Sequence, residues 1–174
     1  MEKKLFEKLK KQLFSSEKKQ IIDALEFIKK EGDDSIIELL AEALVYYDDE
    51  KIKFEIRRLF LEIKNKNVVK NILKIIEDNR FLSERKFFIS LCWQLPLQFD
   101  DFYDKFLKIF YNENFDNAFE AFTVIETIIN KEEVNYPKEI IEKRIDDLKF
   151  HLSELDEQKK ILSMDLIHGW MKHL

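Results

Sequence analysis

Apolar residues recur every three or four positions along almost the whole chain, a spacing that places them on one face of an α-helix. Leu5, Leu9 and Leu13 are the first set to show it. Breaks in this spacing, together with residues that cap helices, divide the chain into segments. The pattern predicts helices over residues 3–14, 17–31, 35–47, 49–63, 67–78, 83–95, 100–112 and 116–130.

Residues between these segments are typical of helix ends. Ser35 and Glu38 match a capping box, in which a hydroxyl and a carboxylate each bond a free backbone N–H. Gly32 stands where a helix C-cap favours a positive φ. Asp49 is placed to cap the helix over 49–63. Pro96 is expected to end the helix before it, because the residue preceding a proline disfavours helical φ and ψ.

The last part of the chain allows two interpretations. Apolar residues at positions 141, 145, 148, 152 and 155 keep a helical spacing, and Lys159 interrupts it. One helix over 138–172 would be unusually long for a compact domain. We therefore favour a hairpin in which Asp156 caps the last helix, and a single long helix stays open. Pro137 suits the first turn of the helix that begins at about residue 138, where no backbone N–H is needed.

Three blocks of the chain superpose with offsets of 32 to 34 residues. In the first helix of each block the matching positions are Ile37, Leu40 and Leu44, then Val69, Ile72 and Ile76, then Tyr103, Phe106 and Phe110. In the second helix they are Ile56, Leu59, Phe60 and Ile63, then Phe88, Leu91, Cys92 and Leu95, then Ala121, Val124, Ile125 and Ile128. Such a period, filled by two amphipathic helices, indicates an α-solenoid in which each pair buries its apolar stripe against its neighbours. Residues 138–172 would supply a degenerate last pair, because Arg144 falls where Leu40 stood.

The blocks DDEKIKFEIRRLF and NRFLSERKFFISL resemble HEAT-like repeats, which often place an Asp before the second helix and an Arg or Lys just inside it. Asp49 and Lys53 fit this pattern in the first copy, Asp78 and Arg85 fit it in the second, and Ala118 departs from it in the third. The period is shorter than the usual HEAT period of about 40 residues. The phrases SLCWQL and AFEAFTVIE also resemble small bacterial proteins of this type. The resemblance covers about residues 34–130 and implies a fold, without a known activity.

The composition supports an all-α fold. Among 174 residues there are only two Gly and two Pro, whereas a sheet needs such residues at turn after turn. We therefore expect one HEAT-like domain over residues 1–174, an α-α superhelix of four to five antiparallel helix pairs. Within it, 1–32 would form N-terminal capping helices, 34–130 three helix-pair repeats and 137–173 a C-terminal helical hairpin.

Net charge and the length of apolar runs narrow the choice of binding partners and cellular compartment. The formal net charge of −5 weighs against a general nucleic-acid binder, since phosphate contact needs a basic surface. The longest uncharged run, 87–99, is too short to span a bilayer, and Pro96 breaks it. The N-terminus lacks the apolar run of a signal peptide. With a single cysteine, a reducing compartment fits best, so we expect a cytoplasmic protein.

No motif in the sequence carries catalytic, cofactor or metal chemistry. His151, His168 and His173 do not pair at the i, i+3 or i, i+4 spacing that would place two metal ligands on one helix face. A glycine-rich phosphate loop, a nucleophile elbow and a His-Glu-x-x-His motif are all missing from the sequence. Cys92 matches a core position, where a buried thiol is a poor nucleophile. We expect no enzyme, no cofactor and no metal.

The second helices carry another stripe, opposite the core one. It comprises Phe54, Arg57 and Leu61, then Lys86, Ile89 and Trp93, then Phe119, Phe122 and Glu126. Two interpretations stay open: a second contact face between neighbouring repeats, or a groove with aromatic anchors and basic flanks. For the groove, the candidate partner-binding residues are Arg57, Arg58, Leu61, Lys86, Ile89, Trp93, Phe119 and Phe122.

These features favour a non-catalytic scaffold or adaptor that binds a protein or peptide along the inner helices. Trp93 would be buried by the partner, while Arg57 and Arg58 orient an acidic segment of it. One alternative is a DNA-binding enzyme resembling the HEAT-like alkylpurine DNA glycosylases, and another is a self-associating structural subunit. We expect neither nucleic acid nor a membrane as partner. The partner's identity, the pathway and the oligomeric state stay open.

Overall fold

The computed structural model describes residues 1–131 and 136–174. Every regular element in these residues is a helix, which confirms the all-α prediction. The chain forms two compact units, unit 1 (Met1–Gln98) and unit 2 (Phe99–Leu174), and the division falls between the second and third predicted repeats. A single domain over residues 1–174 stays a prediction.

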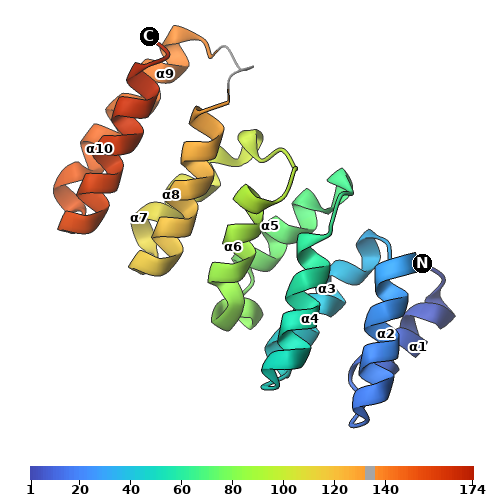
Figure 1. Cartoon of the computed structure of the whole chain (residues 1–174). Helices are drawn as coiled ribbons and strands as arrows, with labels where there is room; N and C mark the ends of the chain where they lie inside the picture. The colour runs from blue at the N-terminus through green and yellow to red at the C-terminus, as the bar shows by residue number, and fades with distance from the viewer. Residues whose placement is uncertain (132–135) are drawn as a thin grey trace. The chain divides into compact units, whose positions relative to one another are not determined.

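Unit 1 contains six α-helices that pair in chain order, α1 with α2, α3 with α4 and α5 with α6 (Figure 1). They are α1 (Lys3–Leu13), α2 (Lys18–Glu31), α3 (Ile37–Tyr46), α4 (Glu50–Leu61), α5 (Val69–Glu77) and α6 (Arg85–Gln94). Short 3-10 helices precede three of them: η1 (Asp34–Ile36), η2 (Lys66–Val68) and η3 (Asn79–Glu84). The predicted helices of this region are therefore present, with α3, α5 and α6 entered through a tighter turn.

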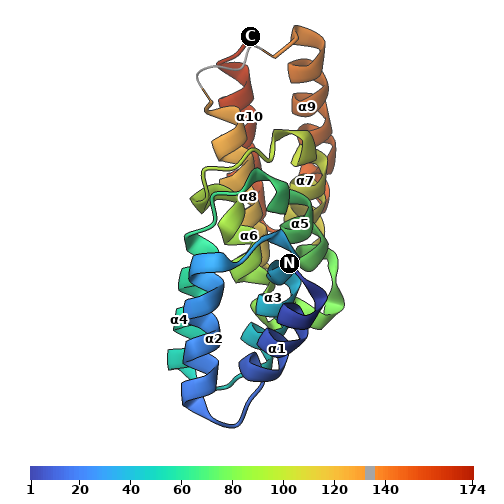
Figure 2. The same ribbon diagram turned by 90° about the vertical axis from the view of Figure 1, so that its right-hand side faces the viewer.

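Like helices of successive pairs in unit 1 also touch. Helix α2 contacts α4, α4 contacts α6, and α3 contacts α5. Figures 1 and 2 accordingly show α2 and α4 on one side of unit 1 and α1 and α3 on the other. Phe60 on α4 and Phe88 on α6 are fully buried, and their ring centroids lie 5.5 Å apart. Each such ring removes enough apolar surface from water to contribute about 1.5–3 kcal/mol.

In residues 99–131 and 136–174, unit 2 contains four α-helices: α7 (Tyr103–Asn112), α8 (Phe115–Ile129), α9 (Lys138–His151) and α10 (Glu157–Met171), with η4 (Asp100–Phe102) and η5 (Leu152–Glu154). Helix α8 contacts both α7 and α10, and α10 contacts α9. The hairpin prediction is confirmed, because α9 ends before η5 and the Asp156 side chain accepts a hydrogen bond from the Lys159 backbone N–H at 2.9 Å.

The repeat predicts the core positions well. Phe60, Cys92 and Ile125, which match one another in the three copies, are all buried. The remaining matched positions are buried too, apart from Leu59 and Ile63, which are partly exposed at the end of α4. The superposed blocks therefore identify the apolar face of each helix.

Two predicted helix ends are wrong. Gly32 has a φ of −67°, so no left-handed C-cap is formed. A Cβ at this position would lie 2.4 Å from the Ile28 carbonyl oxygen, so close backbone approach explains the glycine. Ser35 does not open a capping box; instead the Asp33 carboxylate accepts hydrogen bonds from the Ser35 backbone N–H and hydroxyl. Asp49 caps α4 as predicted, accepting from the backbone N–H of Lys51 at 2.8 Å.

Candidate functional site

Three large apolar side chains are exposed on the second helices of unit 1. Phe54 and Leu61 lie seven residues apart on α4 and are 61% and 45% exposed, and Trp93 on α6 is 40% exposed. Residues seven apart on a helix lie nearly above one another, so Phe54 and Leu61 share one side of α4. Since α4 contacts α6, these side chains belong to neighbouring helices of one unit.

Two of the predicted partner-binding residues are not on an exposed surface. Ile89 is fully buried within unit 1 and Phe122 is only 7% exposed within unit 2, so neither side chain is available to a partner. For these two positions the contact-face interpretation of the second stripe describes the structure better than the groove. Phe119 is 45% exposed and stacks on Phe122 with centroids 6.0 Å apart. Phe119 and Phe122 lie in unit 2, whereas the other six predicted residues lie in unit 1.

The predicted basic residues of α4 carry acidic partners within unit 1. Arg57 donates to the Glu84 carboxylate at 2.9 Å and lies 3.4 Å from Glu50. Arg58 pairs with Glu55 at 3.3 Å and with Glu62 at 3.8 Å. Lys86, the third predicted cation, is exposed on α6.

Glu84 is the centre of an ion-pair cluster that the sequence analysis did not identify. Its side chain is 7% exposed and accepts hydrogen bonds from Lys53 and Arg57, both at 2.9 Å. Two cations on one nearly buried carboxylate compensate the loss of its hydration. A separation of 31 residues between Lys53 and Glu84, about one repeat, is the signal that could have revealed the pair.

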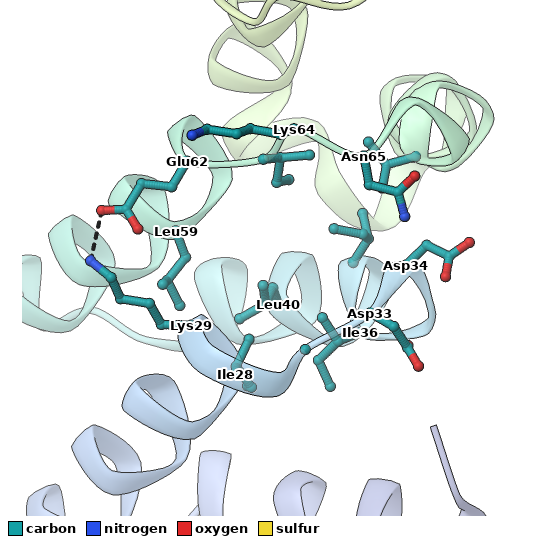
Figure 3. A pocket seen from close by; sticks show the side chains of 14 residues that line it. Ile28, Lys29, Asp33, Asp34, Ile36, Leu40, Leu59, Glu62, Lys64 and Asn65 are labelled. Carbon is teal, nitrogen blue, oxygen red and sulfur yellow. Dashed lines mark hydrogen bonds and ion pairs between the residues drawn. The ribbon is translucent and has the colours of Figure 1, made fainter.

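A pocket of about 210 Å³ opens in unit 1 between the ends of α2 and α4 and the short helices η1 and η2 (Figure 3). Its floor is aliphatic, with Ile28, Ile36 and Leu40. An ion pair between Lys29 and Glu62, 2.8 Å long, lies at one end of it, as the dashed line in Figure 3 shows. The pocket is small, and the two charged side chains at this end are paired with each other.

A larger pocket of about 500 Å³ lies in unit 2 between α7 and α9. Arg144 lines it, and the guanidinium carbon of this residue lies 4.1 Å from the ring centroid of Tyr103, 4.4 Å from that of Trp170 and 5.1 Å from that of Tyr136. Cation–π contacts of this kind stabilise a partly desolvated guanidinium. They explain how an arginine is accommodated where the repeat predicts an aliphatic core residue.

Three polar atoms beside this pocket are shielded from solvent and have no hydrogen-bond partner among the described residues. They are Arg144 Nη1, the Tyr111 hydroxyl and His151 Nδ1. The Tyr111 and His151 rings meet edge to face at 4.4 Å. Leaving a buried polar group without a partner costs roughly 1–3 kcal/mol. Burial raises the pKa of Tyr111, and the nearby Asp147 carboxylate and Tyr103 raise it further, so its hydroxyl keeps its proton at neutral pH.

Cys92 has the environment expected of a structural cysteine. It is 4% exposed, and its Sγ lies 3.7 Å from the Phe88 carbonyl oxygen. Burial raises the pKa of this thiol well above its usual value. A thiol that stays protonated is a weak nucleophile.

The described residues hold no group of three or more His, Cys, Asp or Glu side chains placed to share a metal ion. Within the same residues, no helix combines the length and apolar character that crossing a membrane requires. No protein-family model, curated protein or solved structure matches this chain.

Proposed function

We propose that the protein is a HEAT-like α-solenoid that works without catalysis, by binding a protein or peptide partner on the exposed side of its second helices. The solenoid part is supported by the 32- to 34-residue repeat and by the contacts of α2 with α4 and of α4 with α6. Solenoids of this kind use stacked helices as extended binding surfaces. We place the protein in the bacterial cytoplasm, where Cys92 stays reduced.

The observation that carries the binding proposal is the exposure of Phe54, Leu61 and Trp93 on adjoining helices. Contiguous apolar side chains on a surface mark interaction sites, and interface hot spots are enriched in Trp. A partner that covers these three side chains would remove their apolar surface from water. The binding energy would come from that burial.

The structure modifies the part that the arginines play in this proposal. Arg57 is held by the nearly buried Glu84, whereas the Arg58 side chain is 47% exposed and, among the described residues, pairs with Glu55 on its own helix and with Glu62 at the end of that helix. Exposed ion pairs exchange partners at little cost. Arg58 is therefore the residue that would turn to an acidic group of the partner, and Arg57 would stay within the fold.

A photo-crosslinking experiment tests the proposal. A photoreactive amino acid replaces Phe54 or Leu61 in the full chain expressed in its native host, and Phe150 on α9, which is 74% exposed, serves as the matched control position. We expect one discrete protein adduct from positions 54 and 61 that Trp93→Ala weakens, and no such adduct from position 150. Equal adducts at all three positions, or none at 54 and 61, would contradict the proposal.

Self-association is a second candidate, because one side of α10 exposes three large apolar side chains. Ile161 is 64% exposed, Met164 41% and Met171 53%. Sedimentation of the wild type and of Ile161→Lys over a range of concentrations tests it: a mass that rises with concentration only in the wild type supports a homo-oligomer. A mass that stays at 21.2 kDa throughout excludes it. The glycosylase-like alternative has no comparable observation in its favour, since the formal net charge is −5 and Arg57 is held by Glu84.

A further inference from the structure

We infer that the pocket between α7 and α9 in unit 2 binds a carboxylate carried on an apolar body, with Arg144 as its cationic anchor and the Tyr111 hydroxyl as a second donor. This site shares no residue with the surface proposed above, so it stands or falls independently. It rests on the chemistry of the pocket wall.

The first reason is the state of Arg144. Its guanidinium contacts three aromatic rings, but no carboxylate pairs with it among the described residues, and its Nη1 has no hydrogen-bond partner there. An arginine fork is shaped to donate two parallel hydrogen bonds to a carboxylate. The side chain is half-buried and lines the pocket, while Nη1 itself is shielded, so a carboxylate in the pocket supplies the missing anion once the guanidinium turns toward it.

The second reason is the charge of the lining, which selects the kind of anion. Three cationic side chains line the pocket, Lys108, Lys143 and Arg144, against two carboxylates, Asp104 and Asp147, a formal difference of one positive charge between these lysine, arginine and aspartate side chains. A carboxylate with a single negative charge balances this difference. A phosphate dianion would exceed it and meet the two aspartates, so the lining favours a carboxylate.

The third reason is the remaining wall. Leu107, Ile140 and the rings of Tyr103 and Tyr111 line the same pocket, and about 500 Å³ accommodates more than a carboxylate alone. Pockets that take organic ligands combine such apolar walls with a few converging polar groups. The shared chemistry is therefore an acid on an aliphatic or aromatic body, either a free small molecule or the C-terminal carboxylate of a peptide that ends in an apolar residue.

The test compares acids with their uncharged amides on the full-length chain, by following backbone amide NMR signals during titration. The probes are phenylacetate against phenylacetamide, and a peptide ending in a free Phe carboxylate against the same peptide amidated. We expect each acid that binds to shift amides in α7 and α9 and to bind at least about tenfold more tightly than its amide, because the amide lacks the charge-assisted hydrogen bonds. Binding of phenylacetate alone identifies a free small acid as the source, and binding of the peptide acid alone identifies a chain terminus.

Matched variants locate the anchor. Arg144→Gln should weaken acid binding at least about tenfold, whereas Lys149→Gln, which removes the same charge from an exposed position on α9 outside the pocket, should change it less than about twofold. Tyr111→Phe removes only the hydroxyl and should weaken binding about three- to tenfold; it also decides the matter if Arg144→Gln does not fold. Equal binding of acid and amide, unchanged affinity in folded Arg144→Gln or Tyr111→Phe, or no shifts in α7 and α9 in the millimolar range would overturn the inference.

Discussion

In unit 1, lysines on the second helix of a pair are ion-paired with carboxylates about one repeat further along the chain. In unit 2, by contrast, Arg144 contacts aromatic rings and Lys159 contacts backbone carbonyl oxygens. Lys18 pairs with Asp49, Lys29 with Glu62 and Lys53 with Glu84, at sequence separations of 31, 33 and 31 residues. These pairs join α2 to α4 and α4 to the start of α6. We name them the rungs of unit 1.

Unit 2 also has one ion pair of this spacing, between Lys131 and Asp100, but two of its other buried or half-buried cations have no carboxylate partner among the described residues. Arg144 lies among the rings of Tyr103, Tyr136 and Trp170. Lys159, 6% exposed, donates from Nζ to the carbonyl oxygens of Tyr111 at 3.1 Å and of Glu113 at 2.7 Å, at the C-terminal end of α7 where such oxygens lack helical partners. The comparison teaches that one plan of paired helices accommodates buried charge either by regular ion pairs or by individual aromatic and backbone sites. The following predictions test it.

The largest expected effect is the loss of Trp170 from unit 2. Its side chain is fully buried, contacts Tyr103, Tyr136 and Arg144, and donates from Nε1 to the Tyr103 hydroxyl at 3.2 Å. Trp170→Ala should lower the free energy of unfolding by about 3–5 kcal/mol in urea denaturation. Trp93→Ala, at a 40% exposed position, is the control and should cost about 1 kcal/mol. We call the rings of Tyr103, Tyr136 and Trp170 around Arg144 the aromatic cage. Similar losses for the two variants would mean that the aromatic cage does not stabilise unit 2.

The next effect concerns the one nearly buried rung of unit 1. Glu84→Gln leaves Lys53 and Arg57 without their shared carboxylate, and it should lower the free energy of unfolding by about 1–3 kcal/mol, less than a fully buried pair because both cations keep some contact with water. Glu50→Gln removes the other partner of Arg57, which is 74% exposed, and should change stability by less than about 0.5 kcal/mol. If Glu84→Gln and Glu50→Gln had equally small effects on stability in thermal and urea denaturation, the ion pairs of Glu84 would not be a stabilising feature.

Alkaline pH should weaken the aromatic cage of unit 2. Burial raises the pKa of Tyr103 to about 12, although the Trp170 hydrogen bond and Arg144 oppose this shift. The ordinary pKa of tyrosine is about 10. The stability that the buried, protonated Tyr103 hydroxyl contributes is therefore fully present below about pH 10 and is lost as the pH rises through about 12. At pH 11 the loss is about 1.4 kcal/mol. Urea denaturation at pH 8 and 11 checks it: Tyr103→Phe should show a smaller difference between the two pH values, and an unchanged difference would contradict the assignment.

Features of the fold could be predicted from the sequence where they depend on contacts between residues close together in the chain. Helical spacing located each α-helix that the structure describes, and the repeat located core residues such as Phe60 and Ile125. The caps were harder, because Asp33 and Ser35 are nearly equivalent N-cap residues and only the 3-10 turn of η1 distinguishes them. Ile89 looked exposed because helical geometry sets the direction of a side chain, while the width of the covered face depends on neighbouring helices.

The site in unit 2 depended on contacts far apart in sequence. Arg144 and Lys159 appeared only as interruptions of an apolar pattern. Their partners lie elsewhere in the unit, Tyr103 and Trp170 for the arginine and the carbonyls of Tyr111 and Glu113 for the lysine. A single sequence does not say which of its aromatic rings surround a cation. The rungs, by contrast, were accessible in principle, since a base and an acid separated by about one repeat are visible in the sequence.

The smallest expected effect concerns the exposed rungs, and it decides what they do. The Lys29 and Glu62 side chains are 43% and 44% exposed, so water and salt compete with their 2.8 Å ion pair. In a double-mutant cycle with Lys29→Met and Glu62→Gln we expect a favourable coupling that is well below the cost of Glu84→Gln and that disappears in high salt. A coupling as large as the effect at Glu84, or one insensitive to salt, would contradict this. Because pairs that exchange so readily add little stability, their regular spacing is better explained by register. Each places an acid that flanks α4, Asp49 before it or Glu62 after it, opposite one lysine of α2. Neighbouring alignments that would bring like charges together are thereby penalised.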